Sequence, residues 1–222
     1  MLKSKIGLLT IGQSPREDIL PELIPLLNPQ LEIAEVGLLD GLNFEEIEEL
    51  KPETTESQLI SRLNDGSQVK LSEVKICKLL PSTIHRMITE KKVNAVGILC
   101  THNFPKSDFS YPIIYPIDYL KFLVNFILKI TNLGVVVPSN DQIEMTANKW
   151  ETEKIVVKAK SPYSKSKSWR RIIQLFVQEK VEAIVLDCIG YKIMDKQEIQ
   201  NLIPVPILLP SLILVFAINQ LF

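Results

Sequence analysis

Along the chain, short apolar runs alternate with charged stretches that have a helical pattern of apolar and polar positions. The clearest apolar runs are VNAVGILC, which ends at Cys100, and VEAIVLDC, which ends at Cys188. Each run follows a charged stretch, and a lysine precedes each cysteine at the same spacing. Apolar runs of this length, dominated by Val, Ile and Leu, are typical of strands that are buried on both faces of a parallel sheet.

A second pattern repeats after each cysteine run. Pro112–Pro116 has the sequence PIIYP and Pro206–Pro210 has the sequence PILLP, and both lead into a long apolar stretch. A weaker third pair consists of Ile6–Thr10 and Leu133–Val137, which are apolar runs with a glycine in second place. Repetition of several elements in the same order predicts two related α/β halves.

We therefore predict an α/β fold of two pseudo-symmetric lobes, each built on a parallel sheet, with the site in the cleft between them. The expected N-terminal lobe comprises residues 1–116 plus 210–222, and the expected C-terminal lobe comprises residues 117–209. The acidic segment 40–67 carries two Asp-Gly turn signals and is predicted to be an insertion with one or two short helices. It is interpreted either as a solvated acidic face or as a lid.

The remaining elements are predicted from local patterns. Glu32–Leu38 and Val69–Leu71 are expected to be strands, and Ser72–Lys91 a helix that is interrupted at Pro81. Cys77 shares a helical face with apolar residues, which predicts core packing. Further helices are expected over residues 168–180 and at the C-terminus, where Ser211 is the predicted N-cap and a candidate for the cleft.

The segment GQSPR (Gly12–Arg16) follows the first predicted strand. Ser14 is expected to cap a helix, Pro15 to occupy its first turn, and Glu17 to complete a capping box. The amino end of such a helix binds carboxylate or phosphate, and Arg16 would add a bidentate contact. The alternative is a helix cap with a surface arginine. In the second half, Ser139 and Asn140 take the positions of Gln13 and Ser14, which predicts a second anion-binding loop.

The two cysteines are the candidate reacting groups. After the first come a hydroxyl, an imidazole and an amide, and a protonated histidine near a thiol lowers the thiol pKa. Asp187, beside the second cysteine, is a candidate for orienting a partner or accepting a proton. The alternative is that both cysteines are structural and buried. The candidate catalytic residues are Cys100 and Cys188, and the candidate ligand-binding residues are Gln13, Ser14, Arg16, Thr101, His102, Asn103, Ser139, Asn140, Asp187 and Ser211.

Composition narrows the classes of function. The chain has 222 residues, 46% hydrophobic and 23% charged, with a net charge of −1. It therefore has no global field for nucleic acid or anionic membrane, and its basic segment 158–171 is predicted to be a loop. Leu202–Phe222 contains three prolines in its first nine residues, which favours a buried strand and helix over a membrane span. Three cysteines without framework spacing and no signal peptide lead us to expect a cytoplasmic protein. Cys100 and His102 could form half of a zinc site, but no Cys or His cluster supplies the other ligands at metal-site spacing, so no bound metal is expected.

Three segments together resemble the AroM family. They are IGQSPR (Ile11–Arg16), LDCIG (Leu186–Gly190) and the PILL that begins at Pro206, and the resemblance covers essentially the whole chain. This family is similar to the aspartate/glutamate racemase superfamily, which has two pseudo-symmetric α/β lobes with the site between them. The resemblance implies a cofactor-independent acid/base pair formed by one cysteine from each lobe, and first βα loops whose amides and hydroxyls hold substrate carboxylates. These roles fall on Cys100 and Cys188, and on Gln13, Ser14, Ser139 and Asn140.

The chain departs from the racemase pattern in two places. Racemases of that superfamily have an Asp-Ser pair in the first βα loop, where this chain has Gln-Ser-Pro-Arg. Their second cysteine is followed by Thr-His, whereas Ile189 and Gly190 follow the second cysteine here and Thr-His follows the first. The arginine in the first loop suggests a more anionic ligand than a simple amino acid.

The sequence therefore predicts a racemase- or isomerase-like enzyme that acts on a small carboxylate, or a phosphorylated carboxylate, by two-cysteine acid/base chemistry without a cofactor. A related option is attack of one thiolate on an activated double bond. The alternative from another class is a non-catalytic small-anion binding or regulatory protein on the same scaffold, in which the cysteines are only packed. Neither nucleic acid nor membrane is an expected partner, and the sequence allows a homodimer.

Overall fold

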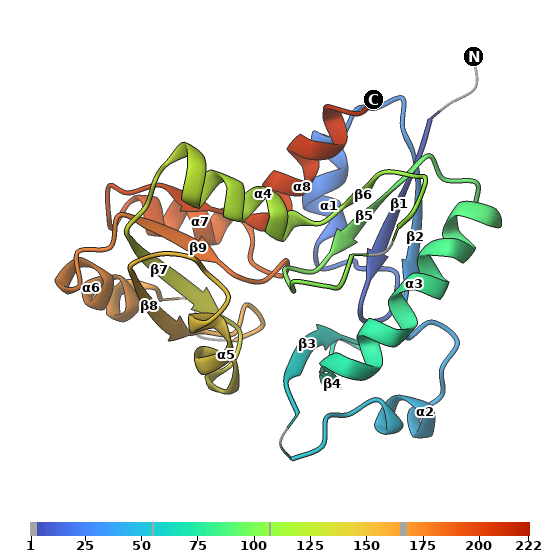
Figure 1. Ribbon diagram of the computed structural model, residues 1–222, viewed down its shortest axis with the longest axis horizontal. Coiled ribbons are helices and arrows are strands. Elements are labelled where there is room, and N and C mark those ends of the chain that lie inside the picture. The colour runs from blue at the N-terminus through green and yellow to red at the C-terminus, as the bar shows by residue number, and fades with distance from the viewer. Residues whose placement is uncertain (1–3, 55, 107, 165–167) are drawn as a thin grey trace. The chain divides into compact units, whose positions relative to one another are not determined.

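The computed structural model describes residues 4–54, 56–106, 108–164 and 168–222. The chain divides into two compact units, the first formed by Met1–Tyr115 with Leu214–Phe222 and the second by Pro116–Ile213. Each unit contains a four-stranded sheet in which every pair of neighbouring strands is parallel (Figure 1). The predicted α/β class, with one parallel sheet in each lobe, is confirmed.

The sheet of the first unit has the order β2-β1-β5-β6. Its central strands are buried at nearly every position because helices cover both faces. A Cβ on Gly7 would touch Met87 of α3, whereas a Cβ on Gly97 would touch Leu214 of α8. The elements are β1 (Lys5–Thr10), α1 (Leu20–Leu23), a 3-10 turn (Ile24–Leu26), β2 (Glu32–Gly37), α3 (Glu73–Thr89), β5 (Ala95–Leu99), β6 (Ile113–Ile114) and α8 (Pro210–Asn219), which enters this unit at Leu214.

The sheet of the second unit has the order β10-β9-β7-β8. Its core includes Trp169, Phe176 and Tyr191, which are fully or almost fully buried against β9 and β10. The elements are α4 (Pro116–Phe122), a π-helical turn (Leu123–Ile127), β7 (Asn132–Val137), a 3-10 turn (Asn140–Gln142), α5 (Ile143–Ala147), β8 (Lys154–Ala159), α6 (Arg170–Gln178), β9 (Ala183–Leu186), α7 (Ile193–Gln200) and β10 (Ile207–Leu208).

The two cysteine strands have the same hydrogen-bond register within their own sheets. The Val96 N–H and the Ile184 N–H each donate to the carbonyl oxygen of the first proline in the PIIYP or PILLP segment, at 3.0 and 2.9 Å. Cys100 and Cys188 each lie four residues after those donors. The spacing read from the sequence therefore corresponds to equivalent positions at the carboxyl ends of β5 and β9.

The entrances to these strands also match. Lys92 and Lys180 both take a left-handed backbone conformation, with φ of 55° and 56°. The Asn94 and Glu182 side chains each accept a hydrogen bond from the N–H of the first residue of the neighbouring central strand, at 2.7 and 3.2 Å. The repeat therefore extends beyond apolar composition to the turn geometry that directs each chain segment into its sheet.

The insertion extends in the structure from residue 40 to residue 72, beyond the predicted end at residue 67, and contains a helix and a β-hairpin. α2 (Phe44–Glu49) begins with a capping box in which Asn43 and Glu46 bond each other's backbone N–H groups. β3 (Gln58–Arg62) and β4 (Gln68–Ser72) then pair antiparallel as a separate two-stranded sheet. The predicted short helix and the predicted strand at Val69–Leu71 are confirmed. β3 was not predicted, because its polar composition hides a strand that is stabilised only by its partner.

Two predictions about α3 are wrong. The helix runs unbroken through Pro81, because Ile76, Leu80 and Ile84 remain buried against the sheet on both sides of it. Cys77 is half-buried, because the buried stripe of α3 passes one position away from it. The Ser72 side chain caps the helix by accepting a hydrogen bond from an N–H in the first turn.

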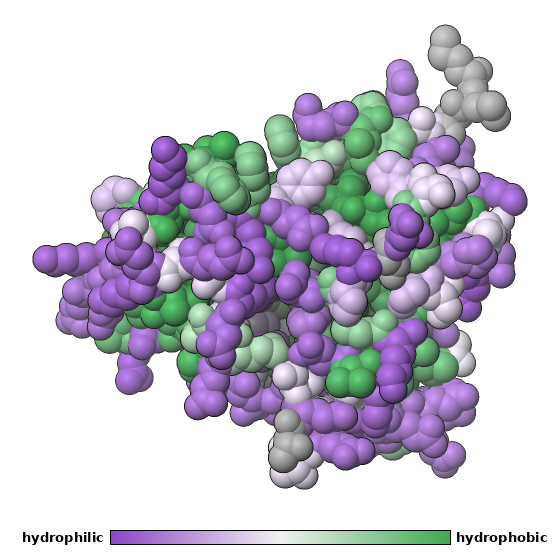
Figure 2. Space-filling view, viewed as in Figure 1, coloured by the Kyte–Doolittle hydropathy of each residue, from purple (hydrophilic) through white to green (hydrophobic). Residues whose placement is uncertain are grey.

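The molecular surface is mixed in character. Figure 2 shows hydrophilic residues over most of one face, with smaller apolar areas between them. Some apolar residues are exposed on α4 and the turn after it, where the Phe122 and Phe126 rings stack at 5.6 Å between centroids. Within the described ranges, no helix combines the length and the apolar character needed to cross a membrane.

Candidate functional site

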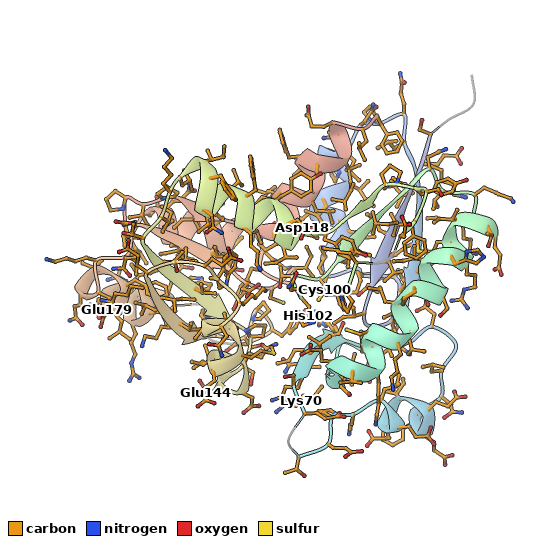
Figure 3. All side chains as sticks on the ribbon, viewed as in Figure 1. Lys70, Cys100, His102, Asp118, Glu144 and Glu179 are labelled. Atoms are coloured by element: carbon orange, nitrogen blue, oxygen red, sulfur yellow. The ribbon has the colours of Figure 1, made fainter. Side chains whose placement is uncertain are left out.

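The two candidate cysteines have the same local geometry. Cys100 directly follows β5 and is half-buried, and Cys188 follows β9 by two residues and is buried. Each sulfur accepts a hydrogen bond of 3.4 Å from the backbone N–H two residues later, which belongs to His102 in the first unit and to Gly190 in the second. Figure 3 shows Cys100 and His102 beside the carboxyl end of β5. An N–H donated to sulfur favours the thiolate, which is the reactive form.

The loop after Cys100 carries an imidazole–carboxylate pair. The Nε2 atom of His102 lies 3.3 Å from a carboxylate oxygen of Glu73, the first residue of α3. The His102 ring also meets the edge of Phe104, with 4.8 Å between ring centroids. Thr101 is buried and Asn103 is exposed. The sequence analysis predicted a thiol and an imidazole in one loop, but it did not predict the carboxylate of Glu73 that contacts the imidazole.

The predicted helix cap at Ser14 is wrong. No helix begins there, since α1 begins only at Leu20 and has no side-chain cap. The Ser14 N–H and hydroxyl instead donate to the two carboxylate oxygens of Asp40, at 2.7 and 2.5 Å. A charged acceptor is a stronger partner than a neutral one. The chain's own carboxylate therefore takes the hydrogen bonds that were predicted for a ligand anion.

Arg16 is buried rather than on the surface, with 3% of its side chain exposed. Its guanidinium donates to both carboxylate oxygens of Asp18 at 2.9 Å and to the Thr10 hydroxyl at 2.9 Å. Burial opposes ionisation of Asp18, but the hydrogen bonds and the charge of Arg16, with the charge of Arg62, hold the pKa of that carboxyl below its usual value. The interpretation of Arg16 as a surface arginine is wrong. Its interpretation as a ligand clamp remains a prediction, and it requires the guanidinium to release Asp18.

The GQSPR segment also holds the hairpin of the insertion. The Gln13 N–H donates to the Arg62 carbonyl oxygen at 3.2 Å, and the Gln13 side-chain oxygen accepts from the Asn64 N–H at 2.9 Å. A Cβ on Gly12 would clash with that same carbonyl and with the Ser61 hydroxyl. The glycine is therefore needed for close approach of β3, and the segment fastens the insertion to the first βα loop.

In the second unit, Ser139 caps a helical turn. Its hydroxyl accepts from the Asp141 N–H at 3.4 Å, and Asn140, the next residue along the chain, is exposed. The turn is a single 3-10 turn, and the five-residue α5 follows it. Helices this short contribute little dipole, so the binding of an anion here would depend on individual N–H and hydroxyl donors.

A buried ion pair lies beside Cys188. The Lys149 ammonium is 2.7 and 2.8 Å from the two carboxylate oxygens of Asp187. Only 14% of the lysine side chain and 3% of the aspartate side chain are exposed. The sequence predicted a partner for Asp187 but missed Lys149, because the two residues are 38 positions apart in the chain and no local signal connects them.

The loop after Cys188 is closely packed. A Cβ on Gly190 would approach the Tyr163 hydroxyl oxygen to 2.6 Å, so a side chain at this position would have to displace that ring. The Tyr191 hydroxyl donates to the Lys160 carbonyl oxygen at 2.5 Å, and burial raises the pKa of Tyr191 well above its usual value. Close packing gives a physical reason for a glycine where racemases of the superfamily have a histidine.

Ser211 is not an N-cap as predicted. α8 begins at Pro210, so Ser211 lies inside its first turn, where it is almost fully buried. Its hydroxyl is one of several buried side-chain polar atoms in the described ranges for which no hydrogen-bond partner is found within the protein. In the same ranges no group of three or more His, Cys, Asp and Glu side chains is placed to hold a metal ion.

Comparisons with known proteins agree on family and fold. A family model described as AroM protein matches residues 6–222. No curated protein matches the sequence. The structure resembles that of glutamate racemase from Francisella tularensis subsp. tularensis SCHU S4 in complex with D-glutamate, with a TM-score of 0.62 and 18% identity over 99% of this chain and 80% of that one.

Two further solved structures have a similar fold. Allantoin racemase from Pseudomonas fluorescens has a TM-score of 0.63 and 13% identity over 98% of this chain and 90% of that one. A maleate isomerase from Pseudomonas putida S16 with maleate has a TM-score of 0.55 and 11% identity over 98% of this chain and 91% of that one. At identities this low the structural similarity shows a shared fold alone, and it extends over nearly the whole chain.

Proposed function

Because the chain belongs to the AroM family and has the fold of racemases and an isomerase, we propose that it is a racemase- or isomerase-like enzyme. Its proposed substrate is a small carboxylate, and Cys100 and Cys188 are its proposed acid/base pair. The observation that carries this proposal is the equivalence of the two thiols, which share a strand register and an N–H···S hydrogen bond.

In the racemisation mechanism, one cysteine begins as thiolate and the other as thiol. The thiolate takes the proton from the carbon next to the substrate carboxylate, and the thiol returns a proton to that carbon, so the two sulfurs exchange protonation states. No electrons leave the substrate, so no redox cofactor is needed. A carbon acid of this kind ionises only if the resulting anion is strongly stabilised. Backbone N–H groups, together with the cations Arg16 and Lys149 described above, would have to provide this stabilisation.

An isomerisation needs the same thiolate in a different role. The thiolate adds to an activated double bond, the resulting single bond rotates, and expulsion of the thiolate restores the double bond in the other geometry. A similar structure is named as an isomerase of maleate, and two others as racemases of glutamate and allantoin. Both reactions use a thiolate at the end of a parallel sheet, so both fit the proposed residues.

The proposed carboxylate-binding groups are in the first βα loop of each unit. In the first unit a ligand carboxylate would accept the Ser14 hydrogen bonds in place of Asp40. In the second unit the donors are the side chain of the exposed Asn140 and the hydroxyl of Ser139, for which a ligand carboxylate would take the place of Asp141. Arg16 is the third proposed ligand-binding group of the first loop, and its guanidinium would have to release the Asp18 carboxylate to contact the ligand.

A thermal-shift panel of small mono- and dicarboxylic acids, phosphorylated acids and both amino-acid enantiomers tests this proposal. At 100 times its Kd, a ligand that binds only the folded state adds about 2.7 kcal/mol of stability, which corresponds to roughly 5–10 °C for a chain of this size. We expect such a rise with at least one carboxylate, and we expect Ser14→Ala to abolish it.

Ser82→Ala is the matched control, because Ser82 is exposed on α3 and only bonds a carbonyl of its own helix. This variant should keep the full ligand-induced shift. If no carboxylate shifts the melting temperature of the wild-type protein, the proposed substrate class is wrong. A shift that survives Ser14→Ala would exclude the first loop as the binding site.

A further inference from the structure

Glu73 is a charged side chain beside the Cys100 loop that the sequence did not suggest. It is the first residue of α3 and directly follows β4 of the insertion. Its backbone is fixed from two directions, because the Glu73 N–H donates to the Ser57 carbonyl oxygen at 3.0 Å and the preceding N–H, of Ser72, donates to the Leu50 carbonyl oxygen at 2.8 Å. The carboxylate therefore projects from a firmly held junction.

His102 is fixed by contacts on three sides. Its Nε2 atom lies 3.3 Å from a Glu73 carboxylate oxygen, which is an ion-pair distance without hydrogen-bond geometry, its ring meets the edge of Phe104, and its backbone N–H donates to the Cys100 sulfur. The nearest cation along α3, Lys75, is turned away and donates to backbone carbonyls of residues 49 and 51. Glu73 is thus the charged group placed to act on this imidazole, and a carboxylate at such a distance favours the protonated ring.

We propose that Glu73 is the positioning residue of the Cys100 half-site, and that it holds His102 as an imidazolium which in turn favours the Cys100 thiolate. Glu73 acts through His102 and does not itself touch the substrate. This inference rests on the proposed function, in which Cys100 exchanges a proton with the substrate, and it gives that cysteine a specific means of activation.

The same contacts give the insertion a role. Its second strand, β4, leads directly into Glu73, which contacts the loop after β5. The end of its first strand, β3, is held by Gln13 and by the ion pair of Arg62 with Asp18 at 3.6 Å. The hairpin is therefore fastened to two loops at the carboxyl edge of one sheet. This arrangement suits a fixed support for the half-site, and it disfavours the interpretation of the insertion as a lid.

A carboxylate that acts directly on a thiol disfavours the thiolate, and Cys77 provides this comparison within the same chain. Cys77 lies on α3 one turn after Glu73, and burial, followed by the negative charge of Glu73, raises the pKa of its thiol. Removal of the Glu73 charge should therefore make Cys77 more reactive. Under our proposal it should make Cys100 less reactive, because the imidazolium loses its partner.

The experiment measures alkylation of each cysteine by iodoacetamide in the full-length protein, followed by peptide mass spectrometry between pH 6 and 9. In Glu73→Gln we expect the alkylation rate at Cys100 to fall roughly tenfold at neutral pH. Without Glu73 the thiol would lose the adjacent imidazolium, and loss of an adjacent opposite charge shifts the pKa of a group by about one unit or more. The rate at Cys77 should stay the same or rise. An unchanged or increased rate at Cys100 would overturn the proposal.

Two more variants separate positioning from structural damage. Glu73→Asp keeps the charge and should restore most of the Cys100 rate. His102→Gln should lower that rate as much as Glu73→Gln does, and the double variant should lower it no further, because both act through one pathway. If the losses add instead, or if Glu73→Gln speeds up all three cysteines together, the carboxylate acts by holding the fold and the proposal is wrong.

The outcome is also separable from that of the proposed function. A slowed Cys100 in Glu73→Gln, without turnover of any tested acid by the wild-type protein, would leave the Glu73 assignment intact and reject the enzyme. Turnover by the wild-type protein, with Cys100 labelling unaffected in Glu73→Gln, would reject the Glu73 assignment alone.

Discussion

Replacement of Cys188 by serine is expected to lower turnover roughly 10²- to 10⁴-fold, which is the usual contribution of a positioned acid or base. A serine hydroxyl is nearly isosteric with the thiol but does not ionise in the accessible pH range, so it can neither remove nor return the proton. Cys100→Ser should cause a loss of similar size, because each turnover uses both sulfurs. Turnover is measured by following interconversion of the carboxylate that the thermal-shift panel identifies.

Binding should survive these changes. Both serine variants are expected to keep the ligand-induced thermal shift, since the proposed carboxylate donors lie on other loops. Cys77→Ser is the matched control for loss of a thiol, because Cys77 is half-buried on α3 and has no proposed part in catalysis. If Cys188→Ser or Cys100→Ser retains more than half of the wild-type rate, two-cysteine chemistry is refuted.

Lys149→Met is expected to cost about 3–5 kcal/mol of unfolding free energy, which is the usual penalty for removing one partner of a buried ion pair. The substitution leaves the Asp187 carboxylate, only 3% exposed, without its cation. The loss should be seen as a lower midpoint in urea denaturation followed by tryptophan fluorescence. Asp187→Leu in addition should recover part of it, because the double variant removes the unpaired charge.

The chain offers a matched control on the same unit. Lys154 and Glu179 form an ion pair of 2.8 Å, but the two side chains are 53% and 48% exposed. Lys154→Met should therefore cost less than about 1 kcal/mol. If the two lysine variants lose the same small amount of stability, burial does not strengthen the Lys149–Asp187 pair as we infer.

The parts of the fold that could be predicted are those specified by local pattern. β5 and β9 were predicted because burial on both faces requires continuous apolar runs, and their repeated spacing marked both cysteines. β8 and α7 were missed because charged residues interrupt their apolar positions, and each is stabilised by elements that are distant in sequence. The sequence therefore indicated the centre of each sheet better than its surroundings.

The candidate site shows the same limit at the level of side chains. The GQSPR segment has the pattern of a helix cap, but Ser14 bonds Asp40, 26 positions later in the chain. Lys149 and Asp187 are 38 positions apart, and Glu73 reaches His102 from a different element. Such pairs form only after the strands have brought their loops together at one edge of a sheet, so no local sequence motif predicts them.

The most direct test of the account is hydrogen exchange at the reacting carbon of the identified ligand. The wild-type protein is incubated with that ligand in D₂O, and deuterium at the reacting carbon is followed by proton NMR. Two-cysteine acid/base chemistry predicts incorporation of solvent deuterium together with inversion or isomerisation, and predicts its loss in both Cys100→Ser and Cys188→Ser. Undiminished exchange in the serine variants, or tight binding by the wild-type protein without any exchange or isomerisation, would contradict it.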